Sequence, residues 1–217
     1  MAGRMRETSF IVQSFAELSA LRGEWNELLG RCPGYFVSQT FNWSAVAWEY
    51  VAQPRGRRLF CVGLREADRL VAFWPMVVYR QGGAEVVRPL GTEGSEYSTP
   101  LVEEGADAER RTRQLLAFIA GKADLIFLPF VRGDSELSKA IPGLGLLRAA
   151  DHGGPAPFIK RSAFDDWETY RRSWTSFLRN KMKRMHARLS RHGTVTMGEE
   201  DPRNAREVIG WIIAQKA

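Results

Sequence analysis

The side chains most suited to chemistry are concentrated in one window, residues 170–192. This window holds eight Lys or Arg residues and no Asp or Glu, whereas the rest of the chain holds 23 basic and 25 acidic residues. The net charge of +6 carried by the 217 residues is therefore local. A local cluster of cations indicates one anion-binding site, whereas evenly spread charge would mainly indicate solubility.

The spacing within this window predicts a helix over 173–192, with Ser173 as its N-cap and Gly193 as its end. One stripe of this helix is apolar and consists of Trp174, Leu178, Met182, Met185 and Leu189. The adjacent stripe is largely cationic and consists of Phe177, Lys181, Arg184, Arg188 and Arg191. Three interpretations stay open: a solvated amphipathic helix, a site for a phosphate or carboxylate of a small molecule or cofactor, and a nucleic-acid contact.

A second candidate is the polar loop 91–100, which follows a predicted strand end, where α/β proteins often place ligand contacts. The Glu96 carboxylate, next to the Tyr97 hydroxyl, could position or deprotonate an amine nucleophile. The alternative is a capped surface loop in which both side chains satisfy local backbone groups.

Metal and nucleophile chemistry find no support in the motifs. His152, His186, His192, Cys32 and Cys61 show no metal-ligand spacing, and the chain has no G-x-S-x-G, P-loop or G-x-G-x-x-G. No metal is expected, and no catalytic residue or general base is assigned. Both cysteines are predicted to be reduced, and the chain shows no signal peptide or membrane span. These features are typical of a bacterial-type cytoplasmic protein.

Apolar periodicity and turn residues predict the elements that must position these groups. In chain order we expect a strand 9–13, helices 15–29 and 43–51, strands 58–65, 70–79 and 85–90, an extended piece 99–102, a helix 107–120, a buried strand 124–131, a helix 134–141 and a strand 145–149. The three central strands form an antiparallel meander. Pro75 cannot donate to a sheet ladder, so it predicts a bulge or an edge position.

This order matches that of the Gcn5-related N-acetyltransferase (GNAT) superfamily, an α/β fold with a mixed, largely antiparallel sheet flanked by helices. An acetyl-CoA site of this type needs a glycine-containing turn that offers backbone N–H groups to pyrophosphate at the start of the following helix. The corresponding turn, residues 102–109, instead carries four acids: Glu103, Glu104, Asp107 and Glu109. We therefore expect that this domain, taken alone, does not bind acetyl-CoA in the usual way.

Beyond an extended linker 157–161, a second region begins with predicted helix 164–171 and the basic helix. A strand 194–197 and a helix beginning at Asp201 and Pro202 follow. The last helix carries Val208, Ile209, Trp211, Ile212 and Ile213 and stands at the end of the sequence. We expect a first domain over 1–160 and a truncated second domain over 161–217, or a subunit contact through helix 202–217.

The chain resembles the CelD-like acetyltransferases, which belong to the GNAT superfamily and are related to the Fem peptidyltransferases. The resemblance covers nearly the whole chain. It lies in the helix end 25–29, Phe41-Asn42-Trp43, the strand 70–76 with its Pro75, the segment 91–102 and the run Trp174-x-x-Phe177-Leu178-Arg179-Asn180-Lys181-x-Lys183-Arg184. It implies two tandem GNAT-like domains, with the basic helix opening the second.

The resemblance also implies a function. We expect an N-acyltransferase that uses acetyl-CoA or another acyl-CoA as co-substrate and acts on an amine or an amino-sugar-type acceptor. The expected binding residues are Lys181, Arg184, Arg188, Arg191, Glu96 and Tyr97. The alternative is a non-catalytic binding module that uses helix 173–192 for nucleic acid or an acidic partner, although the slightly acidic remainder of the chain makes nucleic acid the weaker interpretation.

Overall fold

The structure is a computed structural model, and it describes residues 7–32, 34–94, 97, 99–146, 153–155, 157–196 and 201–216. The chain divides into two compact units, Met1–Ala150 (unit 1) and Asp151–Ala217 (unit 2). Within the described residues, no helix has both the length and the apolar character that crossing a membrane requires.

Unit 1 contains eight strands in two four-stranded sheets. The strands are β1 (Glu7–Val12), β2 (Arg58–Leu59), β3 (Cys61–Glu66), β4 (Arg69–Trp74), β5 (Met76–Gln81), β6 (Ala84–Pro89), β7 (Leu101–Val102) and β8 (Leu125–Ile126). One sheet has the order β1-β3-β4-β7 and the other the order β2-β5-β6-β8. All pairs are antiparallel except β6 with β8. The predicted mixed, largely antiparallel α/β fold is confirmed.

The predicted meander is also confirmed. Its first strand is split at Phe60 into β2 and β3, and its second at Pro75 into β4 and β5, so that each passes from one sheet to the other. The break at Pro75 is expected, because proline has no N–H to donate to a sheet. Backbone hydrogen bonds close both breaks, from Phe60 N to Met76 O at 2.9 Å and from Leu90 N to Pro75 O at 2.9 Å. The residue pairs 67–68 and 82–83 make the hairpin turns, all with positive φ, the geometry that two-residue turns favour.

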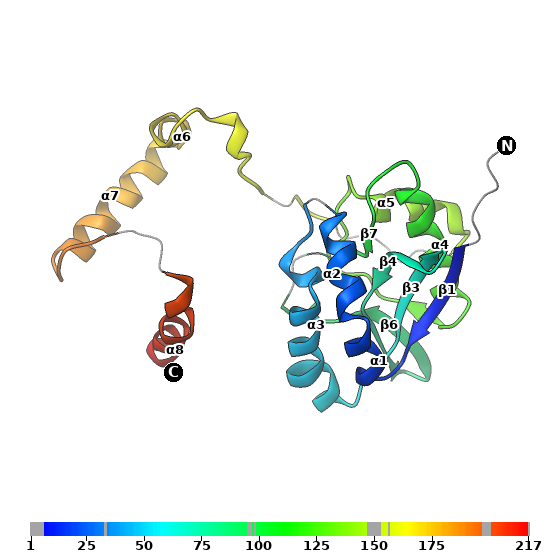
Figure 1. Cartoon of the computed structure of the whole chain (residues 1–217). Coiled ribbons are helices and arrows are strands. Elements are labelled where there is room, and N and C mark those ends of the chain that lie inside the picture. Colours follow the sequence, from blue (N-terminus) through cyan, green and yellow to red (C-terminus); the bar gives the residue numbers. More distant parts are fainter. Residues whose placement is uncertain are drawn as a thin grey trace. The chain divides into compact units, whose positions relative to one another are not determined.

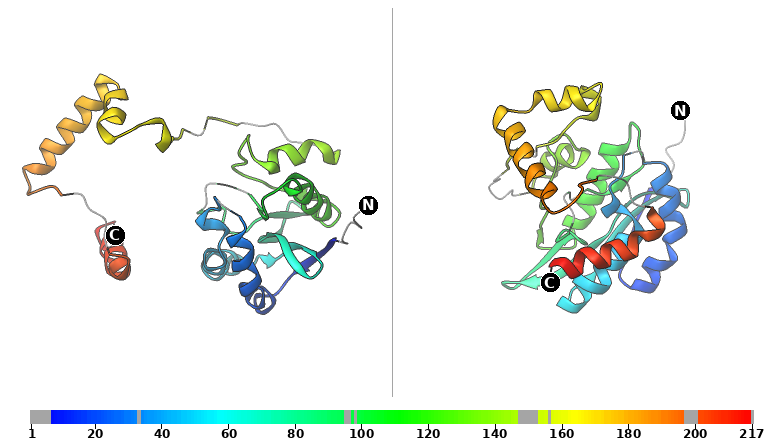
Figure 2. Two further views of the ribbon diagram at one scale, coloured as in Figure 1. Left: turned by 45° about the horizontal axis from the view of Figure 1, so that its top comes forward. Right: turned by 90° about the vertical axis from the view of Figure 1, so that its left-hand side faces the viewer.

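Helices cover both faces of the sheets (Figure 1; left view of Figure 2). The helices of unit 1 are α1 (Phe15–Ala20), α2 (Arg22–Gly30), α3 (Phe41–Ala47), α4 (Ala108–Ala120) and α5 (Glu136–Ala140), with short turns η1 (Val37–Gln39), η2 (Trp48–Ala52), η3 (Gln53–Arg55) and η4 (Ile141–Leu144). Trp25 and Phe73 lie in the core between the sheets and α1 to α3, whereas Trp74 and Leu115 lie in the core beneath α4 and α5.

Three predictions for unit 1 differ from the structure. The single helix 15–29 is two helices that meet at Leu21, whose N–H binds both Glu17 O and Leu18 O and so tightens the turn. The buried strand 124–131 is reduced to β8. It pairs on one edge only, and Leu125 is 52% exposed. Phe130, four residues after the end of β8, has a positive φ that an extended strand does not adopt. Of the predicted strand 145–149, residues 145–146 form no strand and the rest lie outside the described residues.

Unit 2 is helical. Its elements are η5 (Arg161–Ala163), α6 (Trp167–Ser173), α7 (Ser176–Ser190), η6 (Pro202–Asn204) and α8 (Ala205–Lys216). Ser173 ends α6 rather than capping the basic helix, since its hydroxyl bonds Tyr170 O. The N-cap of α7 is Thr175, whose side chain accepts from Leu178 N at 3.2 Å. No strand forms over 194–196, and residue 197 lies outside the described part of the chain.

Candidate ligand pocket

A pocket of about 740 Å³ opens in unit 1 where four segments meet. Its walls come from the loop after α2 (Cys32, 34–36 and Gln39), from 99–102 with β7, from the first turn of α4 and from the start of α5. The floor is closed by the buried side chains of Leu101, Thr112 and Leu137. The pocket is therefore lined in part by the acidic turn 102–109.

Side chains of the loop after α2 tie two of these walls together. The Gln39 amide donates to Pro100 O at 2.9 Å and to Thr99 O at 3.3 Å, and its oxygen accepts from Phe36 N at 2.8 Å. The Cys32 thiol donates to Val102 O at 3.1 Å. These bonds occupy the Gln39 amide nitrogen and the Cys32 thiol and hold the walls together.

The side chains of Phe36, Tyr97 and Arg132 form a stack beside the pocket that joins three segments of the chain. The Arg132 guanidinium lies 5.7 Å from the centre of the Tyr97 ring, and Tyr97 lies 4.9 Å from the Phe36 ring. Arg132 also forms a bidentate ion pair with Asp134, with Nε–Oδ1 and Nη2–Oδ2 distances of 2.9 and 2.6 Å. The Arg132 hydrogen bond lowers the pKa of Asp134, so this carboxyl stays ionised. The stack thus presents a paired, not a free, cation to the pocket.

The charge of the pocket lining is negative. Three carboxylates line the pocket, those of Glu104, Asp134 and Glu136, against the single guanidinium of Arg132. Asp134 is paired with Arg132 and Glu136 with Lys139, whereas Glu104 has no ion pair among the described residues. A lining with unbalanced carboxylate charge favours an ammonium group and repels phosphate.

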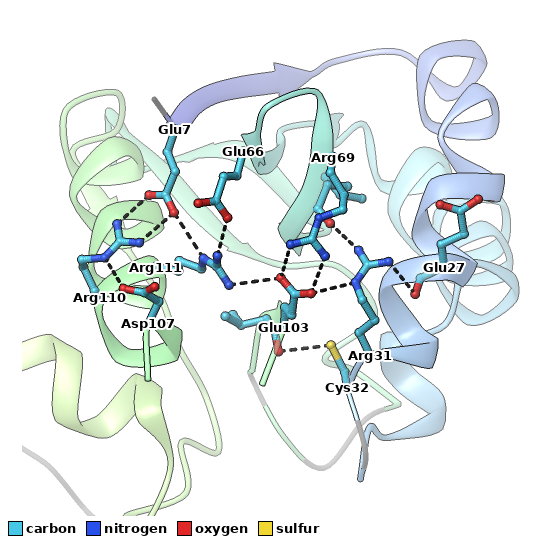
Figure 3. A network of polar contacts seen from close by, with 12 residues as sticks. Glu7, Glu27, Arg31, Cys32, Glu66, Arg69, Glu103, Asp107, Arg110 and Arg111 are labelled. Atoms are coloured by element: carbon cyan, nitrogen blue, oxygen red, sulfur yellow. Dashed lines mark hydrogen bonds and ion pairs between the residues drawn. The ribbon is translucent and has the colours of Figure 1, made fainter. Parts of the chain in front are cut away.

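Glu103, which directly precedes this unpaired carboxylate, is the centre of a closed ionic network (Figure 3). Its carboxylate pairs with Arg31 Nε at 2.9 Å, Arg69 Nη1 at 2.5 Å and Arg111 Nη1 at 3.2 Å. Burial would raise the pKa of Glu103, but the Arg69 hydrogen bond and the three positive charges lower it. An acid of the predicted pyrophosphate turn therefore already occupies a cluster of arginines that could otherwise receive a ligand anion.

The register of the sheet explains why Arg111 is buried within this network. Glu7 on β1 lies directly opposite Glu66 on β3, an arrangement of like charges that is unfavourable without a cation. Arg111 binds both, through Nε to Glu7 at 3.2 Å and through Nη2 to Glu66 at 2.8 Å, and its side chain is only 8% exposed. Arg110 adds a second pair to Glu7, and its hydrogen bonds lower the pKa of that carboxyl.

The pocket offers no reactive thiol or cluster of metal ligands. Burial raises the pKa of Cys32 to about 11, so its sulfur stays protonated near neutral pH. The described residues contain no group of three or more His, Cys, Asp or Glu placed to hold a metal ion. The pocket can bind and orient a ligand, and the Glu104 carboxylate, which has no ion pair among the described residues, is available to accept a hydrogen bond.

The predicted binding residues fall in different places. Tyr97 belongs to the stack beside the pocket, and Glu96 lies outside the described residues. The four predicted cations are Lys181, Arg184, Arg188 and Arg191, and they lie on or next to α7 in unit 2. All four are exposed and have no ion pair among the described residues.

Sequence reasoning missed Gln39 and Arg132, and it identified Glu104 only as an obstacle to an anion. Arg132 could have been found from its spacing, because Asp134 follows two residues later and Ser135 starts a helix. Gln39 carries no local signal, since its partners, Thr99 and Pro100, are about 60 residues away in the chain.

Comparisons with known proteins add little to this picture. No protein-family model matches the chain, and no curated protein matches it significantly. Among solved structures, a point mutant of TTHA1254 from Thermus thermophilus aligns with 72% of this chain and 100% of its own, at 16% identity and a TM-score of 0.37. Glucosamine-6-phosphate N-acetyltransferase from Arabidopsis thaliana aligns with 69% of this chain and 98% of its own, at 12% identity and a TM-score of 0.38. Likenesses at this level assign neither a family nor an activity.

Proposed function

We propose that the chain is part of a GNAT-type N-acyltransferase in which the pocket of unit 1 holds the amine or amino-sugar acceptor. The observation that carries the proposal is the negative lining of this pocket, with the Glu104 carboxylate, which has no ion pair among the described residues, in the bend before α4. The order of strands and helices through α5 agrees with that expected for a GNAT-like domain. Direct attack by the bound amine needs mainly correct positioning, which a preformed pocket supplies.

The acyl-CoA co-substrate requires a separate site for its phosphates in this proposal. Unit 1 has the Glu103 carboxylate among the arginines next to the pocket, and the acids of 102–109 disfavour a further anion. We therefore assign the CoA phosphates to the cationic stripe of α7, with Lys181, Arg184, Arg188 and Arg191 as the contacts. Residues 161–217 would then form the start of a second domain, which binds CoA.

A matched pair of lysines on α7 tests this assignment. Lys181 lies in the cationic stripe and Lys183 lies outside it, and neither forms an ion pair among the described residues. Lys181→Ala should weaken the binding of coenzyme A by about tenfold, the loss of one charge-assisted contact, while Lys183→Ala should leave the affinity nearly unchanged. Calorimetric titration of the chain with coenzyme A measures both, and equal affinities for the two variants would contradict the assignment.

A second candidate function is a non-catalytic module that binds nucleic acid or an acidic partner through α7. The exposed, unpaired cations of this helix favour it. Each phosphate that such a helix neutralises releases counterions, so binding to random duplex DNA should weaken steeply with salt. A titration of fluorescent duplex DNA that finds no binding at low salt would remove this candidate, whereas steep salt dependence together with no coenzyme A binding would favour it.

A further inference from the structure

A second group of arginines in unit 1 surrounds Glu93, in the turn after β6. The guanidinium groups of Arg55, Arg57 and Arg88 all converge on one oxygen, Glu93 Oε1. Arg57 makes the shortest contact, and the Nη1 atoms of Arg55 and Arg88 lie at 3.4 and 3.6 Å. The cations come from the end of η3, from the start of β2 and from β6, so the fold and not a local motif assembles the group.

The charge balance around Glu93 differs from that of the network around Glu103. The Glu103 network joins four arginines, Arg31, Arg69, Arg110 and Arg111, to four carboxylates, Glu7, Glu66, Glu103 and Asp107. Around Glu93, three arginines share one carboxylate among the described residues, which leaves two positive charges without a counter-charge. Glu96 follows Glu93 by three residues in the chain and lies outside the described residues.

Aromatic rings and a hydroxyl group hold two of these cations in place. Arg57 lies 5.2 Å from the centre of the Tyr79 ring, and Arg88 lies 5.3 Å from that of Phe127. Arg88 Nε and Nη2 also bond Thr92 Oγ1, at 3.1 and 2.5 Å. The Arg57 and Arg88 side chains are only 13% and 14% exposed. The cations are therefore preorganised before any ligand arrives, which lowers the entropic cost of binding.

Donors remain available on the solvent side of the group. Arg88 donates hydrogen bonds through Nε and Nη2 to Thr92, and its Nη1 lies 3.6 Å from Glu93, whereas Arg57 and Arg55 donate only through Nη1. The Nε and Nη2 groups of these two arginines have no acceptor in the described part of the chain. The Arg55 side chain is 55% exposed, so a ligand can approach from its side.

We propose that Arg55, Arg57 and Arg88 form an anion site that binds the phosphate group of a phosphorylated small molecule. Planar guanidinium forks suit the tetrahedral oxygens of phosphate. A phosphate monoester carries close to two negative charges above neutral pH, which equals the uncompensated charge of the site. A carboxylate neutralises only half of it. The inference does not depend on acyl transfer, because binding alone is measured.

Titration of the full chain with inorganic phosphate at low ionic strength tests the site. Arg55→Gln and Arg57→Gln should each weaken binding by about tenfold, because each removes a charged donor. Arg58→Gln is the matched control, since Arg58 is the next residue, is 67% exposed and already pairs with Glu85 at 2.7 Å. Arg55 is exposed, so its variant remains informative even if Arg57→Gln disturbs the fold. Absence of saturable phosphate binding, or equal weakening in the Arg58 variant, would overturn the proposal.

Two further arms test the ligand class and the role of Glu96. Acetate should bind more weakly than phosphate at the same ionic strength, and equal affinities would contradict a site for a dianion. Glu96→Gln should leave phosphate affinity within about twofold of the unsubstituted chain, since the proposal places no role on this carboxylate. Phosphate binding that appears only in this variant would mean that Glu96 itself fills the site, and would overturn the proposal for the native chain.

Discussion

Replacement of Glu103 by glutamine should destabilise unit 1 by about 2–3 kcal/mol. The contact with Arg111 dominates, because both side chains are largely buried, at 15% and 8% exposure. The contact with Arg69 contributes less, since that side chain is 48% exposed and its pair is screened by water. Arg31 keeps the hydrogen bonds from Nη1 to Glu27 O and from Nη2 to Leu70 O in the variant, so only its Nε loses a partner.

Urea denaturation followed by far-UV circular dichroism and tryptophan fluorescence measures this loss. Glu109→Gln is the matched control, because Glu109 forms an exposed pair with Arg113 one helical turn away in the same helix. Glu109→Gln should lower the free energy of unfolding by no more than about 0.5 kcal/mol. A double-mutant cycle with Arg111→Gln should show coupling of at least about 1 kcal/mol. Equal stabilities of the Glu103 and Glu109 variants would refute the view that the Glu103 network stabilises the first turns of α4.

The remaining predictions concern pH, backbone geometry and thiol reactivity. The folded-state pKa values of Glu7 and Glu103 are lowered from 4.5, so the stability that these carboxylates contribute is present above pH 4.5 and is lost as the pH falls through their lowered pKa values. The difference in unfolding free energy between the unsubstituted chain and Glu103→Gln should therefore shrink on acidification. A difference that stays constant would contradict this. Gly91→Ala should lower the free energy of unfolding by about 1–3 kcal/mol more than Gly82→Ala does. A Cβ at Gly91 would lie 2.9 Å from Ala47 Cβ, whereas one at Gly82 would meet nothing within 4 Å. Equal melting temperatures of the two variants would argue against this packing. Cys32 and Cys61, whose pKa values burial raises to about 11 and about 12, should resist alkylation in the native chain and react in urea; fast native labelling of Cys32 would contradict its bond to Val102.

The central meander could be predicted because its signals are local. Short apolar runs rich in β-forming residues define the strands, and the turn residues 67–68 and 82–83 set the hairpins. The region 124–131 misled the prediction, since a short apolar run looks the same whether it is a buried strand or an exposed edge. In the structure β8 pairs with β6 on one side only, and Phe130 has a positive φ, so the segment is a short edge strand. Neither feature can be seen in the sequence.

The pocket and its networks could not be predicted, because they depend on long-range register. Glu7 and Arg110 are 103 residues apart in the chain and meet only because β1 pairs with β3 beneath α4. The four acids of 102–109 can be seen in the sequence, and the expectation that they disfavour a pyrophosphate stays a prediction. The arginines that neutralise Glu103 were not identified, since Arg31 and Arg69 lie on other elements.

The most direct test of the central claim is a calorimetric titration of the chain with glucosamine, with glucose as the uncharged control. The account predicts that glucosamine binds more tightly than glucose and that Glu104→Gln weakens glucosamine binding by about tenfold, since it removes the free carboxylate. Coenzyme A affinity should not fall in the same variant, because its phosphates are assigned to α7. Equal binding of the two sugars, or loss of coenzyme A binding in Glu104→Gln, would contradict an acceptor pocket in unit 1.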